Sequence, residues 1–154
     1  MPKRFLASLL LLLASTTAFG HVGVHPSVHD TVAGIVDRMR TELPAEKLTQ
    51  LTVADALAFL TEEERHILAT EHITFTVNVP VVVSVMKEAA LKGEPFWLED
   101  QGFEQTALTV TVMEDAFEVW QKSFDAGNVG LGVNSLSGSG DHYFVAMKPQ
   151  NAGD

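Results

Sequence analysis

The chain has 154 residues, no cysteine, and 20 acidic against 10 basic residues. Without cysteine it can form no disulfide framework and carry no lipid-modified cysteine. The acidic excess opposes binding to nucleic acid and to anionic membranes, because both are polyanions that require a basic patch on the protein.

The N-terminus has the pattern of a cleavable secretory signal. Lys3-Arg4 forms a positive start, Phe5 to Ala14 is an apolar run, and Ala18-Phe19-Gly20 offers small residues to a signal peptidase. The apolar run is shorter than the roughly 20 residues that span a bilayer. We therefore expect a protein that is exported to the periplasm or outside the cell, begins at His21, and does not associate with a membrane after cleavage. Because a small exported domain without disulfides is typical of bacteria, we also expect a bacterial origin.

Residues 21–71 are predicted to be helical. Three N-terminal capping boxes, each a Ser or Thr followed three residues later by an acidic residue, are Ser27/Asp30, Thr52/Asp55 and Thr61/Glu64. After the first box, apolar residues recur at the spacing of one helical face until Pro44 ends the run. Short helices of this kind need a partner surface for their apolar sides.

The pattern changes at residue 72 to the period of two that is typical of strands. Every odd position from Ile73 to Val85 is apolar, which predicts one long half-buried strand. Pro80 cannot donate a ladder hydrogen bond, so we expect the strand to divide there, to cross between sheets, or to lie on an edge. A hairpin of 108–113 and 116–121 would follow, turning at Glu114-Asp115.

Two more strands are expected at 129–133 and 143–147. Several short strands with regular turns favour a mainly β fold, an antiparallel β-sandwich of fibronectin-like or immunoglobulin-like type preceded by two or three short α-helices. The predicted organisation is a signal peptide at 1–20, a helical segment at 21–71 and a β-sandwich domain at 72–154.

Four histidines are candidate metal ligands: His21, His25, His72 and His142. The spacing of four from His21 through His25 to His29 would stack imidazoles on one helix face, but Pro26 pushes the residue before it to an extended conformation. As an N-terminal residue, His21 could instead chelate copper through its α-amine and imidazole, with His72 or His142 completing the set. The alternative to both metal sites is that His21, His25 and His29 belong to a solvated N-terminal segment. We predict no cofactor.

No catalytic residue is predicted either. The acidic segment 62–72 spaces its two histidines by six, whereas the zinc-protease pattern needs two histidines four apart. Gly140-Asp141-His142 is similar to one ligand run of a metallophosphatase, but the other ligands of a two-metal site are missing from the sequence. We interpret the first as a solvated helix face and the second as a turn.

Trp97 and Trp120 are candidates for a ligand-binding surface, because exposed indole rings stack on sugars and aromatic groups. The alternative is that both rings belong to the core of the sheet, each with its N–H satisfied.

Five short motifs follow one another along most of the mature chain: Leu60-Thr61 with Glu64-Arg65, Phe75 to Met86, Pro95 to Leu98, Glu118 to Lys122, and His142 to Val145. In this order they resemble the N-terminal region of bacterial exported metallophosphoesterases similar to purple acid phosphatases. The resemblance implies that a fibronectin-like module and a calcineurin-like catalytic domain with two metal ions would follow, so that the catalytic ligands lie outside this chain.

Three hypotheses result. The first is a non-catalytic accessory or interaction domain of a secreted metallophosphoesterase, whose partner would be a downstream catalytic domain or another protein. The second is a stand-alone exported β-sandwich that binds a ligand at Trp97 or Trp120. The third is a copper-binding protein that uses His21.

Overall fold

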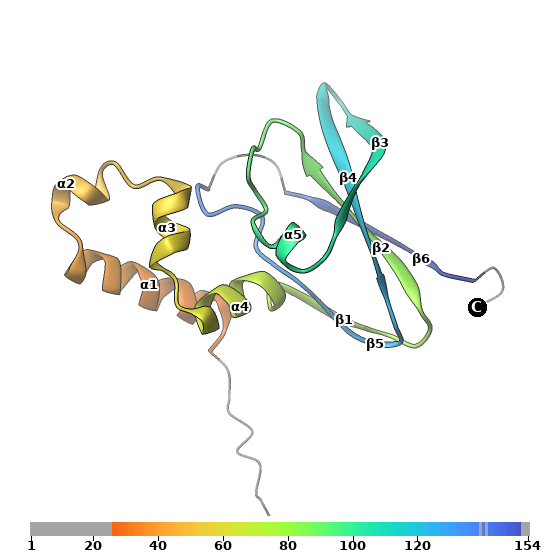
Figure 1. Ribbon diagram of the computed structural model, residues 1–154, viewed down its shortest axis with the longest axis horizontal. Coiled ribbons are helices and arrows are strands. Elements are labelled where there is room, and N and C mark those ends of the chain that lie inside the picture. The colour runs from red at the N-terminus through yellow and green to blue at the C-terminus, as the bar shows by residue number, and fades with distance from the viewer. Residues whose placement is uncertain (1–25, 139, 141, 152–154) are drawn as a thin grey trace, which may run out of the picture.

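The computed structural model describes residues 26–138, 140 and 142–151. Its helical part consists of α1 (Val28–Glu42), α2 (Ala45–Leu48), α3 (Val53–Phe59) and α4 (Glu62–Thr70). The strands are β1 (Ile73–Val77), β2 (Val81–Glu88), β3 (Glu104–Val112), β4 (Asp115–Phe124), β5 (Gly127–Leu131) and β6 (Phe144–Pro149), with a short helix α5 (Trp97–Asp100) between β2 and β3. Helices α1–α4 lie at one end of the molecule and the strands at the other (Figure 1).

The three predicted helix starts are confirmed. The Ser27 side chain accepts a hydrogen bond from the backbone of Asp30, and α1 begins at the next residue. Thr52/Asp55 and Thr61/Glu64 form complete capping boxes at the starts of α3 and α4. These caps satisfy backbone N–H groups that have no partner within the helix. Helix α2 lies within the predicted helical segment but has no predicted start, and α5 was not predicted at all; each is four residues long.

The strands form two antiparallel sheets. β1 pairs with β5, and a second sheet has the order β3-β4-β2-β6. β1 and β2 belong to different sheets, which confirms that the chain divides at Pro80 and crosses between sheets. Helices followed by two antiparallel sheets, neither of which closes on itself, make the fold mixed α/β rather than mainly β.

Two predicted strand boundaries are corrected. β5 ends at Leu131, because the backbone N–H of Val133 leaves the sheet and donates to the carbonyl of Leu68 in α4, at 2.8 Å. The predicted hairpin exists as β3 and β4, but its turn is Met113 and Glu114, and Asp115 already belongs to β4. Met113 has φ 55°, in the left-handed region that non-glycine residues rarely occupy.

The core lies between the two sheets and under α4 and α5. Val81, Val83 and Val85 of β2 are at most 4 % exposed, which confirms the buried face that alternation predicts. A second, smaller cluster joins α1 to α4 through Ile35, Met39 and Leu68. No helix in the described part of the chain combines the length and the apolar character that a membrane crossing requires.

Candidate functional site

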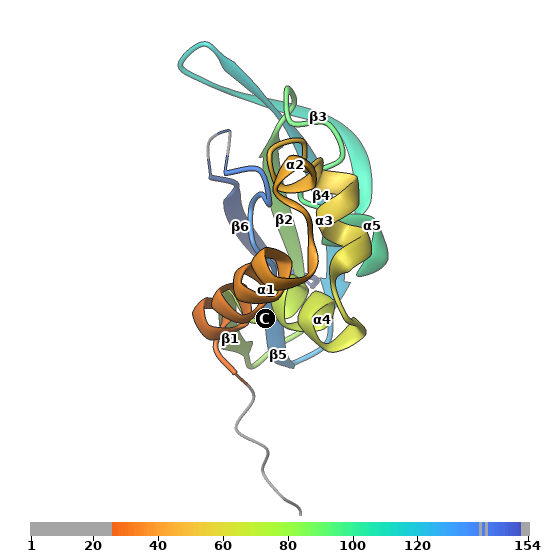
Figure 2. The same ribbon diagram turned by 90° about the vertical axis from the view of Figure 1, so that its left-hand side faces the viewer.

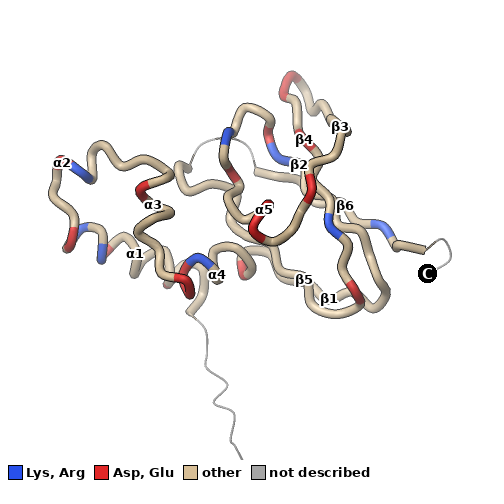
Figure 3. The backbone as a smooth tube through the Cα atoms, in the orientation of Figure 1, with Lys and Arg blue, Asp and Glu red and all other residues tan. Residues whose placement is uncertain are grey.

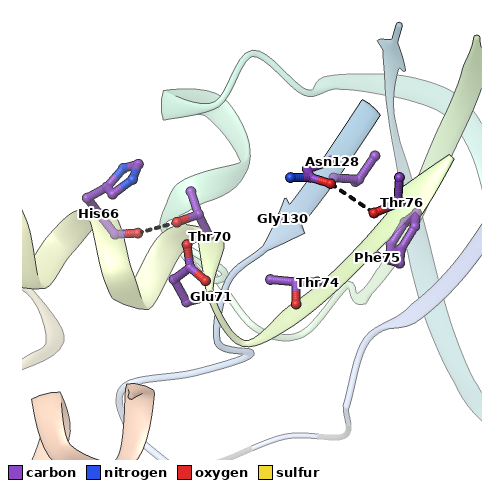
Figure 4. A pocket seen from close by; sticks show the side chains of 9 residues that line it. His66, Thr70, Glu71, Thr74, Phe75, Thr76, Asn128 and Gly130 are labelled. Carbon is purple, nitrogen blue, oxygen red and sulfur yellow. Dashed lines mark hydrogen bonds between the residues drawn. The ribbon is translucent and has the colours of Figure 1, made fainter. Parts of the chain in front are cut away.

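The candidate site is a polar pocket of about 450 Å³ where the C-terminal end of α4 meets the sheet of β1 and β5. In the register of this sheet, Thr74 lies opposite Gly130 and Thr76 opposite Asn128. These four residues lie on the face of the β1–β5 sheet that is turned away from the core. The pocket is lined by His66, Thr70, Glu71, Thr74, Phe75, Thr76, Asn128, Val129 and Gly130 (Figure 4).

Gly130 allows the two walls of the pocket, α4 and β5, to lie close to each other. A Cβ atom at this position would collide with the carbonyl group of Thr70 at the end of α4. Only glycine lets β5 pass this close to the helix without displacing backbone atoms. The spacing between α4 and β5, and with it the shape of the pocket, therefore depends on one residue.

One hydrogen bond orients the amide in the pocket. The Thr76 hydroxyl donates to Oδ1 of Asn128 at 2.8 Å. This contact occupies the amide oxygen and directs the amide nitrogen towards α4 (Figure 4). Asn128 thus presents two N–H donors to the pocket.

The α4 wall supplies mainly hydrogen-bond acceptors. The Thr70 hydroxyl donates to the carbonyl of His66 at 2.9 Å, so its oxygen keeps accepting capacity. Glu71, the C-cap of α4, adds an exposed carboxylate, and the helix C-terminus carries partial negative charge. Within the part of the chain that the structure describes, no Lys or Arg lines the pocket. Donors on one wall and acceptors on the other suit a ligand with several groups, such as hydroxyls, that both donate and accept hydrogen bonds.

The histidine candidates are not brought together as a set. His72 and His142 are both exposed, His72 just after α4 and His142 just before β6. His21, His25 and the predicted signal peptide lie outside the described residues. Among residues 26–138, 140 and 142–151, no group of three or more His, Asp or Glu side chains is placed to hold a metal ion.

Trp97 faces the core, the second of the two interpretations of this residue, and it is not part of a ligand surface. The side chain is fully buried, and its indole N–H donates to the carbonyl of Val133 at 2.8 Å. Edge-to-face contacts hold the ring against Phe103 and Tyr143, with centroids 5.6 and 5.8 Å away.

Trp120 is 9 % exposed and borders a smaller pocket of about 200 Å³. Lys87 and Glu94, two of the charged residues that line this pocket, have partners within the protein. The buried Lys87 ammonium contacts Glu118 at 2.9 Å and the carbonyl of Leu91 at 3.2 Å. The hydrogen bond from Lys87 holds the pKa of the Glu118 carboxyl below its usual value. Glu94 accepts a hydrogen bond from the backbone of Leu136 at 2.8 Å.

The prediction that 62–72 is a solvated helix face is wrong for Glu64. Its carboxylate receives two hydrogen bonds from Arg38 of α1, one of them at 2.8 Å, as well as the capping bond from the backbone of Thr61. These contacts lower the pKa of Glu64 to about 2, with the Arg38 bond as the largest cause. Glu64 therefore joins α1 to α4.

Sequence reasoning missed the pocket residues on β1 and β5. The alternation from Ile73 onward placed Thr74 and Thr76 on a polar face, but nothing in it indicated that Asn128 would lie beside them. Comparison of the chain with protein-family models, with curated proteins and with solved structures finds no significant match.

Proposed function

We propose that the chain is a non-catalytic accessory or interaction domain of an exported protein related to metallophosphoesterases. One observation carries the proposal: the side chains that give the family resemblance have structural roles. Thr61 and Glu64 cap α4, Arg65 pairs with Asp100 at 2.6 Å, and Trp97 is fixed in the core. Such residues build a scaffold and leave the chemistry to another domain.

The arrangement of the core supports a fibronectin-like or immunoglobulin-like sandwich as the finer fold type. Val83 and Val85 of the larger sheet share one core with Val129 and Leu131 of the smaller sheet. Two sheets that bury their inner faces against each other are the defining feature of a sandwich. In this proposal, the domain presents its outer surfaces to partners.

The proposal predicts no turnover of phosphate esters. The purified chain, incubated with p-nitrophenyl phosphate and manganese, zinc or iron, should release no nitrophenol above the rate of the metal alone. Metal-dependent hydrolysis that copurifies with the folded chain would contradict the proposal. Reading the gene beyond Asp154 tests the accessory role separately, since we expect the frame to continue into loops rich in Asp, His and Asn.

The polar pocket favours a second candidate function, a stand-alone exported module that binds a neutral polyhydroxy ligand. Titration calorimetry with glucose and N-acetylglucosamine should then detect millimolar binding. Asn128→Asp keeps the shape but removes the amide donors, so we expect about fivefold weaker binding, equivalent to one lost hydrogen bond. Asn78→Asp, the same change at another exposed asparagine that does not line the pocket, is the matched control. Absence of binding, or equal losses in both variants, would rule out this candidate.

A further inference from the structure

β3 forms an open edge of the four-stranded sheet. Within the described residues it pairs only with β4, and every residue from Ala107 to Val112 is exposed. The β3–β4 hairpin projects beyond the rest of the sheet in both views (Figures 1 and 2). In an antiparallel ladder, alternate residues of an edge strand direct their N–H and C=O groups away from the partner strand. β3 therefore directs main-chain donors and acceptors to a side on which no strand of the described residues pairs with it.

From Gln105 onward, β3 lacks the charged residues and the proline that protect many edge strands. From Gln105 to Met113 it contains no charged residue, no proline and no glycine, and Thr109 to Val112 are β-branched throughout. The opposite edge strand, β6, carries Lys148 and ends at Pro149, both of which discourage pairing with another strand. The two edges of the same sheet thus differ in their readiness to accept a strand.

Part of β3 is irregular, and this limits the accepting segment. The register with β4 shifts between Gln105 and Thr109. In this stretch the Thr106 hydroxyl donates to the carbonyl of Val119 at 2.9 Å and accepts from the backbone of Leu108 at 3.1 Å. The regular segment Thr109 to Val112 is left as the part that can pair on its open side.

Apolar side chains accompany this open edge. Leu108, Val110 and Val112 alternate along β3 and are 59 %, 37 % and 37 % exposed. Met113, at the tip, is 95 % exposed. Val110 lies opposite Phe117 of β4, whose ring packs on Phe144 of β6 with centroids 5.1 Å apart, so apolar surface continues across the sheet. A strand added at β3 would cover side chains that now face water.

Charges at the two ends of β3 indicate the chemistry of the added strand. Glu104 begins β3, and Glu114 and Asp115 form the acidic tip of the hairpin (Figure 3). A strand with an uncharged, alternating apolar centre and basic residues at its ends would match this pattern. A second copy of β3 would instead bring acidic ends of its own, in a chain whose net charge is −10.

We infer that β3 accepts an extended segment of a partner protein as an additional strand, and that this segment has alternating apolar residues flanked by Lys or Arg. Main-chain hydrogen bonds along Thr109 to Val112 supply the affinity, and the side chains of Leu108, Val110 and Val112 supply the selectivity. The inference rests on the proposed role as an interaction domain and names the surface that performs it.

The test uses a fluorescein-labelled peptide of alternating valine and threonine with a pair of lysines at each end, and measures fluorescence anisotropy with the whole chain. We expect micromolar to millimolar binding that weakens with added salt. The same peptide with all of its central amides N-methylated should lose binding at least tenfold, because neither edge of the peptide can then donate to the ladder. Equal binding of the methylated peptide would overturn the inference.

Two substitutions on β3 locate the site. Val112 and Asp115 close the two-residue turn and therefore hydrogen-bond to each other. The N–H of the preceding residue, Thr111, then points to the open edge, because successive residues of a strand alternate. Thr111→Pro removes this donor from the open edge. Val112→Lys adds a charge that repels the basic peptide ends. Each should weaken peptide binding at least tenfold, while far-UV circular dichroism stays that of the wild type.

Met147→Lys on β6 is the matched control, since Met147 is 51 % exposed on the opposite edge. This variant should bind the peptide with an affinity within twofold of that of the wild type. No binding by the wild type, an equal loss in Met147→Lys, or a wild-type dimer that Thr111→Pro dissociates would each overturn the inference. None of these outcomes depends on phosphate ester hydrolysis, which tests the proposed function by itself.

Discussion

Replacing Gly132 by alanine is expected to destabilise the protein by about 3 kcal/mol, the upper part of the range for overpacking a rigid site. A Cβ atom at residue 132 would collide with the indole ring of Trp97 and lie 2.6 Å from the carbonyl oxygen of Leu68. Neither neighbour can move easily. Trp97 is fully buried and hydrogen-bonded to Val133, and the Tyr143 hydroxyl donates to the carbonyl of Gly132 itself at 2.7 Å.

Gly34→Ala is the matched control for this prediction. Gly34 lies within α1, and no atom of the described residues stands within 4 Å of a Cβ atom added there. The same substitution should therefore stabilise the protein by about 0.5–1 kcal/mol, the gain in helix propensity from glycine to alanine. Urea unfolding of both variants measures the two free energies. A Gly132→Ala protein as stable as the wild type would show that the contact between α5 and the chain after β5 is loose.

Features that depend on neighbours in the sequence could be predicted. The capping boxes at Thr52 and Thr61 need only a hydroxyl and an acidic side chain three residues apart, and both are present. Division of the long strand at Pro80 follows from one missing N–H group. In both cases the physical cause lies within a few residues of the effect.

Features that depend on distant partners could not be predicted. Thr76 and Asn128 are 52 residues apart in sequence and meet only because β1 pairs with β5. Arg38 reaches Glu64 across 26 residues, which turns an apparently solvated charge into a link between two helices. Periodicity shows which face of an element is polar, but not which other element lies against it.

The exposed fractions along β3 illustrate the same limit. Alternation correctly predicted the hairpin, and it predicted Val81 to Val85 as buried on one face. Leu108, Val110 and Val112 alternate in the same way, but they are exposed, because they lie on an edge strand whose side chains no described residue covers. Trp97 shows the opposite error, because we considered an exposed ring and the structure buries it. It lies in the four-residue helix α5, which no local pattern predicted. Burial depends on the order of the strands, which no local pattern contains.

Acid is expected to weaken the protein through Glu64. The pKa of this carboxyl is lowered from 4.5 to about 2 in the folded chain, first by the hydrogen bond from Arg38. Above pH 5 the group is charged in both the folded and the unfolded chain, and the pair contributes its full stability. As the pH falls from about 5 to 2 the unfolded chain takes up the proton first, so stability is lost across that window.

The Glu64→Gln variant isolates this contribution. The side chains of Glu64 and Arg38 are 16 % and 29 % exposed, so water screens part of the interaction and we expect a loss of about 2 kcal/mol at pH 6. The difference in unfolding free energy between wild type and variant should shrink to near zero at about pH 2. Glu63→Gln, on the same turn of α4 but exposed, should change the stability little at any pH. Parallel pH profiles for the wild type and Glu64→Gln would show that the salt bridge between α1 and α4 does not hold the helical segment together.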